Sequence, residues 1–253
     1  MSLHRESNFD LQAILSNPPK LHELRGELTS DLRIDDFTCS ELNARLKPGL
    51  QTLETGAGLS TIIFAANGCN HTCIAAHKNQ FGRIQEYCRS ERIDTSAVNF
   101  IVAQSSNVIH QLPPSHFDLI LIDGCHGFPS IFVDFYYAAK LLKLGGTLVI
   151  DDLHIYTCRL VAHFIQADPG WKVETMTGRV ALATKIADTA DEEWINQSFI
   201  VQRSSRPSLV KSALSGRSLR SVRSVRSVRF FLDVSKPLRS RLGLTGRQIL
   251  GKY

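Results

Sequence analysis

The chain has 253 residues, of which 43% are hydrophobic and 21% charged, and these fractions are those of an ordinary globular protein. It contains no apolar run of roughly 18 residues and no apolar stretch at its N-terminus, so we expect a cytoplasmic protein without a membrane span or a signal peptide. The six cysteines form neither a CxxC pair nor a zinc-finger spacing, and we expect free thiols.

Residues 9–16 and 20–33 carry apolar side chains at spacings of three and four, which is typical of helices. We therefore expect an N-terminal helical segment over residues 1–49. The length of the whole chain suits one α/β domain with an appendage better than two full domains.

Strand and helix patterns alternate from residue 50 onward. The expected strands are 51–54, 71–76, 98–103, 117–122, 147–150, 171–176 and 179–184. The expected helices are 60–66, 81–90, 106–112, 129–142 and 156–167. This alternation predicts a Rossmann-like, doubly wound α/β domain over residues 50–202, with a mostly parallel sheet between two helical layers. The short connection at Thr177-Gly178 predicts that the last two strands form an antiparallel hairpin beside the fifth.

Basic residues are concentrated at the C-terminal end. Residues 203–253 hold 13 of the 29 Lys and Arg residues but only 1 of the 24 Asp and Glu residues. Ser-Val-Arg occurs three times in succession over 221–229, which marks a low-complexity segment. We expect a disordered tail that could contact nucleic acid or anionic lipid.

A glycine-containing turn follows the first expected strand of the domain, in the sequence LETGAGLST over residues 53–61. In a doubly wound sheet, ligands bind at the carboxyl ends of the strands, and such a turn lets the backbone approach the ligand closely. Thr61 stands where a dinucleotide-binding fingerprint would place its third glycine. This argues against NAD as the ligand.

Several of these segments resemble a known family. The segment 53–60 resembles motif I of class I S-adenosylmethionine-dependent methyltransferases. IDGCHGFP at 122–129, LLKLGG at 141–146 and IDD at 150–152 resemble the IDGxH…GG…DD pattern of a bacterial branch related to catechol-type and macrolide or aminocoumarin O-methyltransferases. The resemblance covers about residues 50–185. It implies S-adenosylmethionine as cofactor and methylation of a small-molecule or sugar hydroxyl.

The resemblance also implies which residues bind the cofactor. They are Glu54, Thr55, Gly56, Ala57, Gly58, Ser60, Thr61, His77, Ser105 and Asp123. His77 is included because the second strand lacks the acid that usually bonds the ribose hydroxyls in such enzymes, and Asn79 or Gln80 could take this role instead. Ser105 is included because 104–106 is similar to a polar segment beside the adenine in catechol-type enzymes.

Carboxylates follow the fourth and fifth expected strands. Asp123, Asp151 and Asp152 would converge at neighbouring strand ends and repel one another, and a hard cation such as Mg²⁺ would relieve that repulsion. The related metal-dependent enzymes carry their ligands at these strand ends. An alternative without metal has Asp151 or Asp152 capping the next helix and Asp123 contacting the cofactor.

His126 or His154 could act as a general base toward a substrate hydroxyl, and His126 is preferred because it lies within the family-like motif. The candidate catalytic residues are therefore His126 and Asp123. Some relatives carry an Asp at the Cys125 position as the presumed base, and this chain does not, which leaves the assignment of the base open. A solvated loop histidine is the alternative. Two other functions remain open: a binding or regulatory protein that has lost turnover, and a methyltransferase anchored to a polyanion by the tail.

Overall fold

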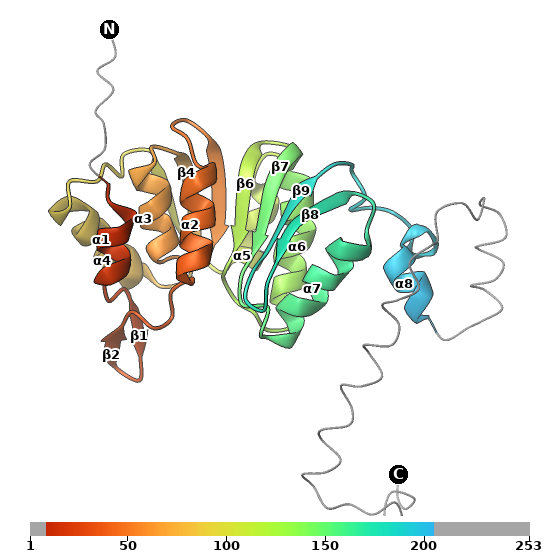
Figure 1. The fold of residues 1–253 in the computed structure, drawn as a ribbon, viewed down its shortest axis with the longest axis horizontal. Helices are drawn as coiled ribbons and strands as arrows, with labels where there is room; N and C mark the ends of the chain where they lie inside the picture. The colour runs from red at the N-terminus through yellow and green to blue at the C-terminus, as the bar shows by residue number, and fades with distance from the viewer. Residues whose placement is uncertain (1–8, 205–253) are drawn as a thin grey trace, which may run out of the picture. The chain divides into compact units, whose positions relative to one another are not determined.

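The computed structural model describes residues 9–204 of the chain (Figure 1). Its helices are α1 Leu11–Ser16, α2 Asp36–Arg45, α3 Leu59–Ala66, α4 Lys78–Ser90, α5 Ser105–Val108, α6 Ser130–Leu141, α7 Tyr156–Ala167 and α8 Ser198–Arg203. Its strands are β1 His22–Leu24, β2 Glu27–Thr29, β3 Gln51–Thr55, β4 Asn70–Ala75, β5 Val98–Val102, β6 Phe117–Ile122, β7 Leu142–Ile150, β8 Trp171–Met176 and β9 Ala181–Lys185. The tail expected over 203–253 lies outside the described residues from 205 onward.

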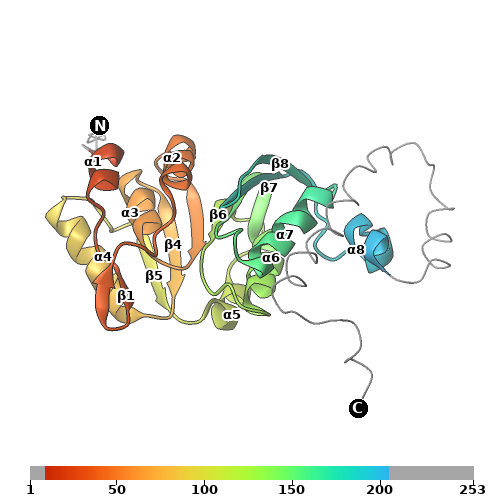
Figure 2. The same cartoon turned by 60° about the horizontal axis from the view of Figure 1, so that its bottom comes forward.

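The main sheet has seven strands in the order β5-β4-β3-β6-β7-β9-β8 (Figures 1 and 2). The pairs from β5 to β7 are parallel, whereas β9 runs antiparallel to both β7 and β8. The predicted doubly wound sheet with a terminal hairpin is thus confirmed. The last strand in the chain is inserted next to β7, and β8 forms the edge.

The central strand β6 shows why the sheet is covered on both faces. Its sequence, FDLILI, is almost continuously apolar, as expected of a strand buried on both sides. Leu119 and Leu121 pack into one core with residues of α1, α2, α3 and α4. Ile120 and Ile122 pack into a second core with residues of α6 and α7. One strand therefore holds both helical layers in place.

The N-terminal segment differs from the prediction. Residues 22–29 form a β-hairpin of β1 and β2 instead of a helix, because Arg25 and Gly26 both have positive φ angles, of 54° and 84°. Two such residues in succession suit the tight turn of a hairpin. The leucines at helical spacing do not form a buried stripe, since Leu24 and Leu28 are 50% and 45% exposed. Among residues 9–49, only α1 and α2 are helical.

One strand boundary differs from the prediction. β7 begins at Leu142 instead of at residue 147, so it includes Gly145-Gly146. In α2, Asp35 is the N-cap, and its carboxylate accepts a hydrogen bond from the Thr38 amide at 2.7 Å. Within residues 9–204 no helix is long and apolar enough to cross a membrane.

Candidate functional site

The loops at the carboxyl ends of β3, β6 and β7 are held together by backbone hydrogen bonds that continue the sheet past the strand ends. The Asp123 amide donates to the Thr55 carbonyl at 2.9 Å, and the Asp151 amide donates to the Ile122 carbonyl at 3.1 Å. The Gly56 amide donates to the Ile74 carbonyl at 2.9 Å. The predicted glycine turn and the predicted aspartates therefore lie at one edge of the sheet, as the parallel order requires.

Gly56 is fixed by a backbone contact. It has a φ of +103°, and a β carbon there would lie 2.1 Å from the Asp123 carbonyl oxygen. Gly124 faces it closely, since a β carbon on Gly124 would lie 3.3 Å from the Gly56 nitrogen. The two glycines bring the β3 and β6 loops together and leave backbone groups at the surface of this edge.

Glu54 lies beneath the glycine turn and not at its surface. It is fully buried, and its carboxylate accepts hydrogen bonds from Ser60 Oγ, at 2.6 Å, and from Thr61 Oγ1. Thr61 Oγ1 in turn accepts the Gly58 amide at 3.1 Å. The three side chains predicted to bind cofactor are thus occupied in supporting the turn. Whether Glu54, Ser60 and Thr61 also contact a cofactor stays a prediction.

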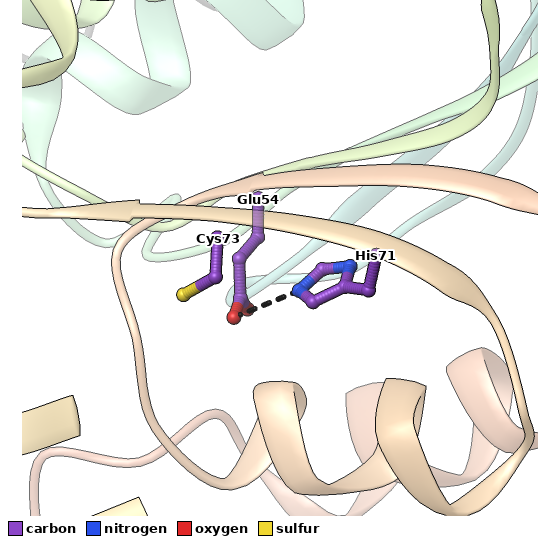
Figure 3. Close-up of side chains that lie close together, drawn as sticks. All are labelled: Glu54, His71 and Cys73. Atoms are coloured by element: carbon purple, nitrogen blue, oxygen red, sulfur yellow. Dashed lines mark hydrogen bonds and ion pairs between the residues drawn. The ribbon is translucent and has the colours of Figure 1, made fainter. Parts of the chain in front are cut away.

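A buried histidine completes this support (Figure 3). His71 Nε2 lies 3.1 Å from Glu54 Oε1, and its Nδ1 lies 2.9 Å from Thr52 Oγ1. The His71 ring stacks on Phe64 of α3 with centroids 4.2 Å apart. Burial alone would raise the pKa of Glu54, but the hydrogen bond and charge of His71 hold that pKa below its ordinary value. The ring is thereby fixed between β3 and α3.

Cys73 lies beside this pair, and its thiol could join Glu54 and His71 as a metal ligand (Figure 3). The donor atoms are already engaged in mutual hydrogen bonds, and Cys73 Sγ donates to the Gly56 carbonyl at 3.3 Å. Burial raises the pKa of the Cys73 thiol well above its usual value, which disfavours the thiolate that a metal requires. We therefore interpret the cluster as structural support.

The second cluster is polar and partly open. His126 Nδ1 lies 3.3 Å from Asp152 Oδ2, and His126 Nε2 lies 3.7 Å from Asp123 Oδ1. One ligand atom from each of these three residues lies within 4.8 Å of the others, close enough to surround one cation. The predicted set of Asp123, Asp151 and Asp152 is changed, since His126 takes the place expected of Asp151 in this group. Asp151 is instead buried, with one carboxylate oxygen lacking a hydrogen bond among the described residues.

Burial and mutual repulsion change the acidity of this cluster. Desolvation, followed by the charges of Asp151 and Asp152, raises the pKa of Asp123 well above its usual value. Burial, with a smaller contribution from the Asp152 charge, raises the pKa of Asp151 to about 7. Burial lowers the pKa of His126, although the Asp152 charge opposes that change. The histidine therefore favours its neutral form, which can accept a proton.

Asp152 links the cluster to the β8–β9 hairpin. It has a φ of +58°, a conformation uncommon outside glycine, and its carboxylate contacts Arg179 Nη2 at 3.2 Å. Its other neighbour, His154, is half exposed, with Nδ1 3.5 Å from Asp152. Thr157 Oγ1 donates a hydrogen bond to the His126 carbonyl. These contacts fix the His126 loop against α7 and the hairpin.

The remaining predicted residues divide into two groups. Thr55, Ala57 and Ser105 are buried around the glycine turn and the start of α5. His77 is exposed at the N-cap of α4, where its side chain makes no capping hydrogen bond. The structure thus leaves His77 accessible beyond the end of β4, and its contact with a ribose stays a prediction.

Sequence reasoning missed His22, and it considered Gln80 only as a possible ribose ligand. Gln80 Nε2 donates to the Ala57 carbonyl at 2.5 Å and lies 3.0 Å from His22 Nδ1. A β carbon on Gly58 would lie 3.0 Å from His22 Nε2, and that nitrogen is buried without a hydrogen-bond partner among the described residues. No local pattern indicated this, because His22 reaches the turn from a separate hairpin.

Comparison with known proteins decides the class of this site. Residues 53–153, which include the glycine turn and all three aspartates, match a family model described as a methyltransferase domain. This match covers the whole candidate site and supports a methyltransferase. A comparison with curated protein sequences gave no match.

Solved methyltransferases share the fold of this domain. The O-methyltransferase TomG from Streptomyces achromogenes, solved with S-adenosylmethionine, is 17% identical with a TM-score of 0.53, over 62% of this chain and 83% of that one. A methyltransferase from Geobacter sulfurreducens is 14% identical with a TM-score of 0.51, over 62% and 81%. The methyltransferase PaMTH1 from Podospora anserina, solved with S-adenosylhomocysteine, is 14% identical with a TM-score of 0.50, over 62% and 81%. These likenesses show the methyltransferase fold.

Proposed function

We propose that the enzyme transfers a methyl group from S-adenosylmethionine to a hydroxyl group of a small molecule or sugar. The supporting observation is the cluster of Asp123, His126 and Asp152 immediately beside the glycine turn. A candidate proton acceptor thereby adjoins the candidate cofactor site, which methyl transfer to a hydroxyl needs.

The residues at this edge fit a cofactor. His22 Nε2, His126 Nε2 and Asp151 Oδ1 are buried without hydrogen-bond partners among residues 9–204. Unpaired buried polar atoms are costly, and a ligand with several polar groups would satisfy them. The backbone of 55–58, Ser105 and His22 would hold S-adenosylmethionine. When bound, this cofactor supplies an electrophilic methyl group on a sulfonium.

The protein's own part in the reaction is to orient the acceptor and remove its proton. His126 Nε2 has no hydrogen-bond partner among the described residues, and its lowered pKa keeps it unprotonated at neutral pH. His126 Nε2 would accept the proton that the acceptor hydroxyl loses when it is methylated. Asp152, beside Nδ1, stabilises the resulting imidazolium.

The same three side chains could hold a divalent cation. Burial is the main cause of the raised pKa of Asp123, and repulsion from Asp151 and Asp152 adds to it. A cation would relieve that repulsion. Because one donor is an imidazole, the set suits Mn²⁺ or another transition metal better than Mg²⁺, which prefers oxygen ligands. His126 cannot be both ligand and base. Metal dependence of turnover therefore distinguishes the two modes.

Calorimetric titration of the full chain with S-adenosylmethionine, and separately with NAD, tests the cofactor assignment. We expect saturable binding of S-adenosylmethionine and none of NAD. Repeating the titration with Mg²⁺, with Mn²⁺ and with a chelator tests the cation. Binding of NAD alone, or of neither compound, would contradict the proposed function.

Substitution tests the base. We expect His126→Gln to lower turnover by about 10²–10⁴-fold while leaving S-adenosylhomocysteine binding intact. His154→Gln is the matched control, because His154 also lies beside Asp152 but is half exposed and is not between two carboxylates. Equal losses in both variants would remove His126 from the role of base.

A further inference from the structure

One carboxyl group in α6 is fully buried, and the mechanism proposed above does not use it. The helix has the sequence SIFVDFYYAAKL, and Asp134 lies in it between apolar neighbours with none of its surface exposed. Within residues 9–204, no cationic side chain forms an ion pair with Asp134. Because a buried carboxylate without a cation is costly, it needs hydrogen-bond donors from its surroundings.

The donors come from two other elements. α5 and the short helical turn after it pack along α6 (Figure 2), and the His110 ring lies 6.1 Å from the ring of Tyr137, about one turn beyond Asp134. This packing places the start of α5, at Ser105, beside Asp134. Burial raises the pKa of Asp134, and hydrogen bonds from the side chains of Ser105 and Thr55 oppose that rise. Both hydroxyl groups are therefore directed at the carboxylate.

These two hydroxyl groups belong to the edge of the sheet that carries the candidate cofactor site. Thr55 ends β3, and its carbonyl accepts the Asp123 amide at 2.9 Å. The Thr55 hydroxyl oxygen lies 3.3 Å from the position of a β carbon on Gly124. Ser105 begins α5, directly beyond the end of β5. Asp134 thus acts on the site through two of its residues and is itself covered by them.

The order of the strands indicates which part of the cofactor faces Ser105. In a doubly wound sheet the ligand lies across the carboxyl ends of the strands, with the glycine turn after the first strand and the ribose at the end of the second. Here these strands are β3 and β4, and β5 is next in the sheet. The base attached to the ribose would therefore extend to the end of β5, which Ser105 follows.

The contact with Asp134 decides what Ser105 offers to that base. An ionised carboxylate only accepts hydrogen bonds, so the single proton of the Ser105 hydroxyl is taken up by Asp134. The hydroxyl oxygen keeps its lone pairs for the ligand and needs a donor. The 6-amino group of adenine is a donor, whereas the 6-oxo group of hypoxanthine is an acceptor and would leave both oxygens unpaired.

We propose that Asp134 is a positioning residue that makes the cofactor site selective for a purine with an amino donor, because it fixes the direction of the Ser105 hydroxyl. This rests on the proposed function, which places S-adenosylmethionine at this edge of the sheet. The same carboxylate holds Thr55, so it also ties the start of α5 to the glycine turn after β3.

Calorimetric titration of the full chain with S-adenosylhomocysteine, and separately with its 6-oxo analogue S-inosylhomocysteine, tests the proposal. Asp134→Asn keeps the shape of the side chain but supplies an amide donor, which would turn the Ser105 proton toward the ligand. Ser105→Ala removes the hydroxyl. Asp168→Asn is the matched control, because Asp168 is also buried and accepts a hydroxyl, that of Thr189, at 2.9 Å. Asp168 follows the C-terminal end of α7, whose first turn adjoins the site.

We expect the wild type and Asp168→Asn to bind S-adenosylhomocysteine about tenfold more tightly than the 6-oxo analogue, a difference equivalent to ~1.4 kcal/mol. In Asp134→Asn this preference should disappear or reverse, and in Ser105→Ala it should disappear. A thermal melt of each protein reports folding. A general loss of packing would weaken both ligands together, so the ratio of the two affinities separates positioning from a structural role.

A preference that persists in folded Asp134→Asn would overturn the proposal. If Asp134→Asn does not fold, Ser105→Ala decides, since an unchanged preference in that variant has the same consequence. If the wild type binds both ligands equally, the selectivity is absent and the proposal is overturned, while the methyltransferase assignment stands. If the wild type binds neither ligand, the proposed function fails, and this inference fails with it.

Discussion

Gly56 and Asp123 approach so closely that a single methyl group on Gly56 would overlap the Asp123 carbonyl oxygen, at 2.1 Å. This contact joins the turn after β3 to the loop after β6, and both halves of the candidate site depend on it. Replacement of Gly56 would therefore disturb the protein itself before it could obstruct a cofactor.

Gly56→Ala should lower the free energy of unfolding by about 3 kcal/mol or more, from the positive φ and the backbone overlap together. Gly49→Ala is the control, since Gly49 also has a positive φ, of +81°, but a β carbon there meets nothing within 4 Å. Gly49→Ala should lower the free energy of unfolding by only about 1 kcal/mol. Urea unfolding measures the free energy of unfolding of both variants. Equal losses in the two would contradict the backbone overlap at Gly56.

Glu54→Gln should destabilise the domain by about 3 kcal/mol at neutral pH, because it leaves His71 without its buried charged partner. The pKa of Glu54 is lowered in the folded state, so its contribution is complete above its ordinary value of 4.5 and is lost as the pH falls through the folded pKa. The difference in unfolding free energy between wild type and variant should therefore shrink below about pH 4.5.

Glu174→Gln serves as the control for that series. The pKa of Glu174 is also lowered, mainly by its hydrogen bond from Thr184, but Glu174 is exposed. Glu174→Gln should lower the free energy of unfolding by less than about 1 kcal/mol. A pH-independent difference for Glu54→Gln would show that the pair with His71 does not stabilise the fold through its charge.

His22→Ala should weaken S-adenosylhomocysteine binding about tenfold, because His22 Nε2 lies against Gly58 and has no partner among the described residues. His22→Gln should restore much of the affinity by supplying another donor. Calorimetry measures the affinities, and a thermal melt reports folding. Unchanged affinity in His22→Ala would limit His22 to a packing role.

Cys125 should be the one cysteine that reacts rapidly with a disulfide reagent in the native protein. All six cysteines lie within residues 9–204, and only Cys125 is exposed. Burial raises the pKa of Cys39 and of Cys158 to about 12, which suppresses their thiolates. Absorbance should show one fast thiol per chain in the wild type and none in Cys125→Ser. Several fast thiols in the wild type would contradict the described packing.

The sequence was sufficient for the order of strands and helices from residue 50 to residue 185. Apolar runs such as FDLILI and turns such as Pro169-Gly170 are local signals, and the parallel order then places Gly56, Asp123 and Asp151 at one edge. The hairpin at 22–29 was not predicted because the leucines there have the spacing that is typical of a helix. Two positive φ angles at the turn are not visible in such a pattern.

What each side chain does at the site was decided by the tertiary structure alone. Glu54 occupies the sequence position at which a cofactor ligand was expected. Its side chain lies beneath the loop because His71, seventeen residues away, and Ser60 supply its hydrogen bonds. His126 lies in the group with Asp123 and Asp152, where Asp151 was expected, and its loop is held by Asp152 and by Thr157 of α7. Local sequence determines which strand end a residue follows. The direction of its side chain depends on partners distant in the chain, and only the folded packing brings those partners together.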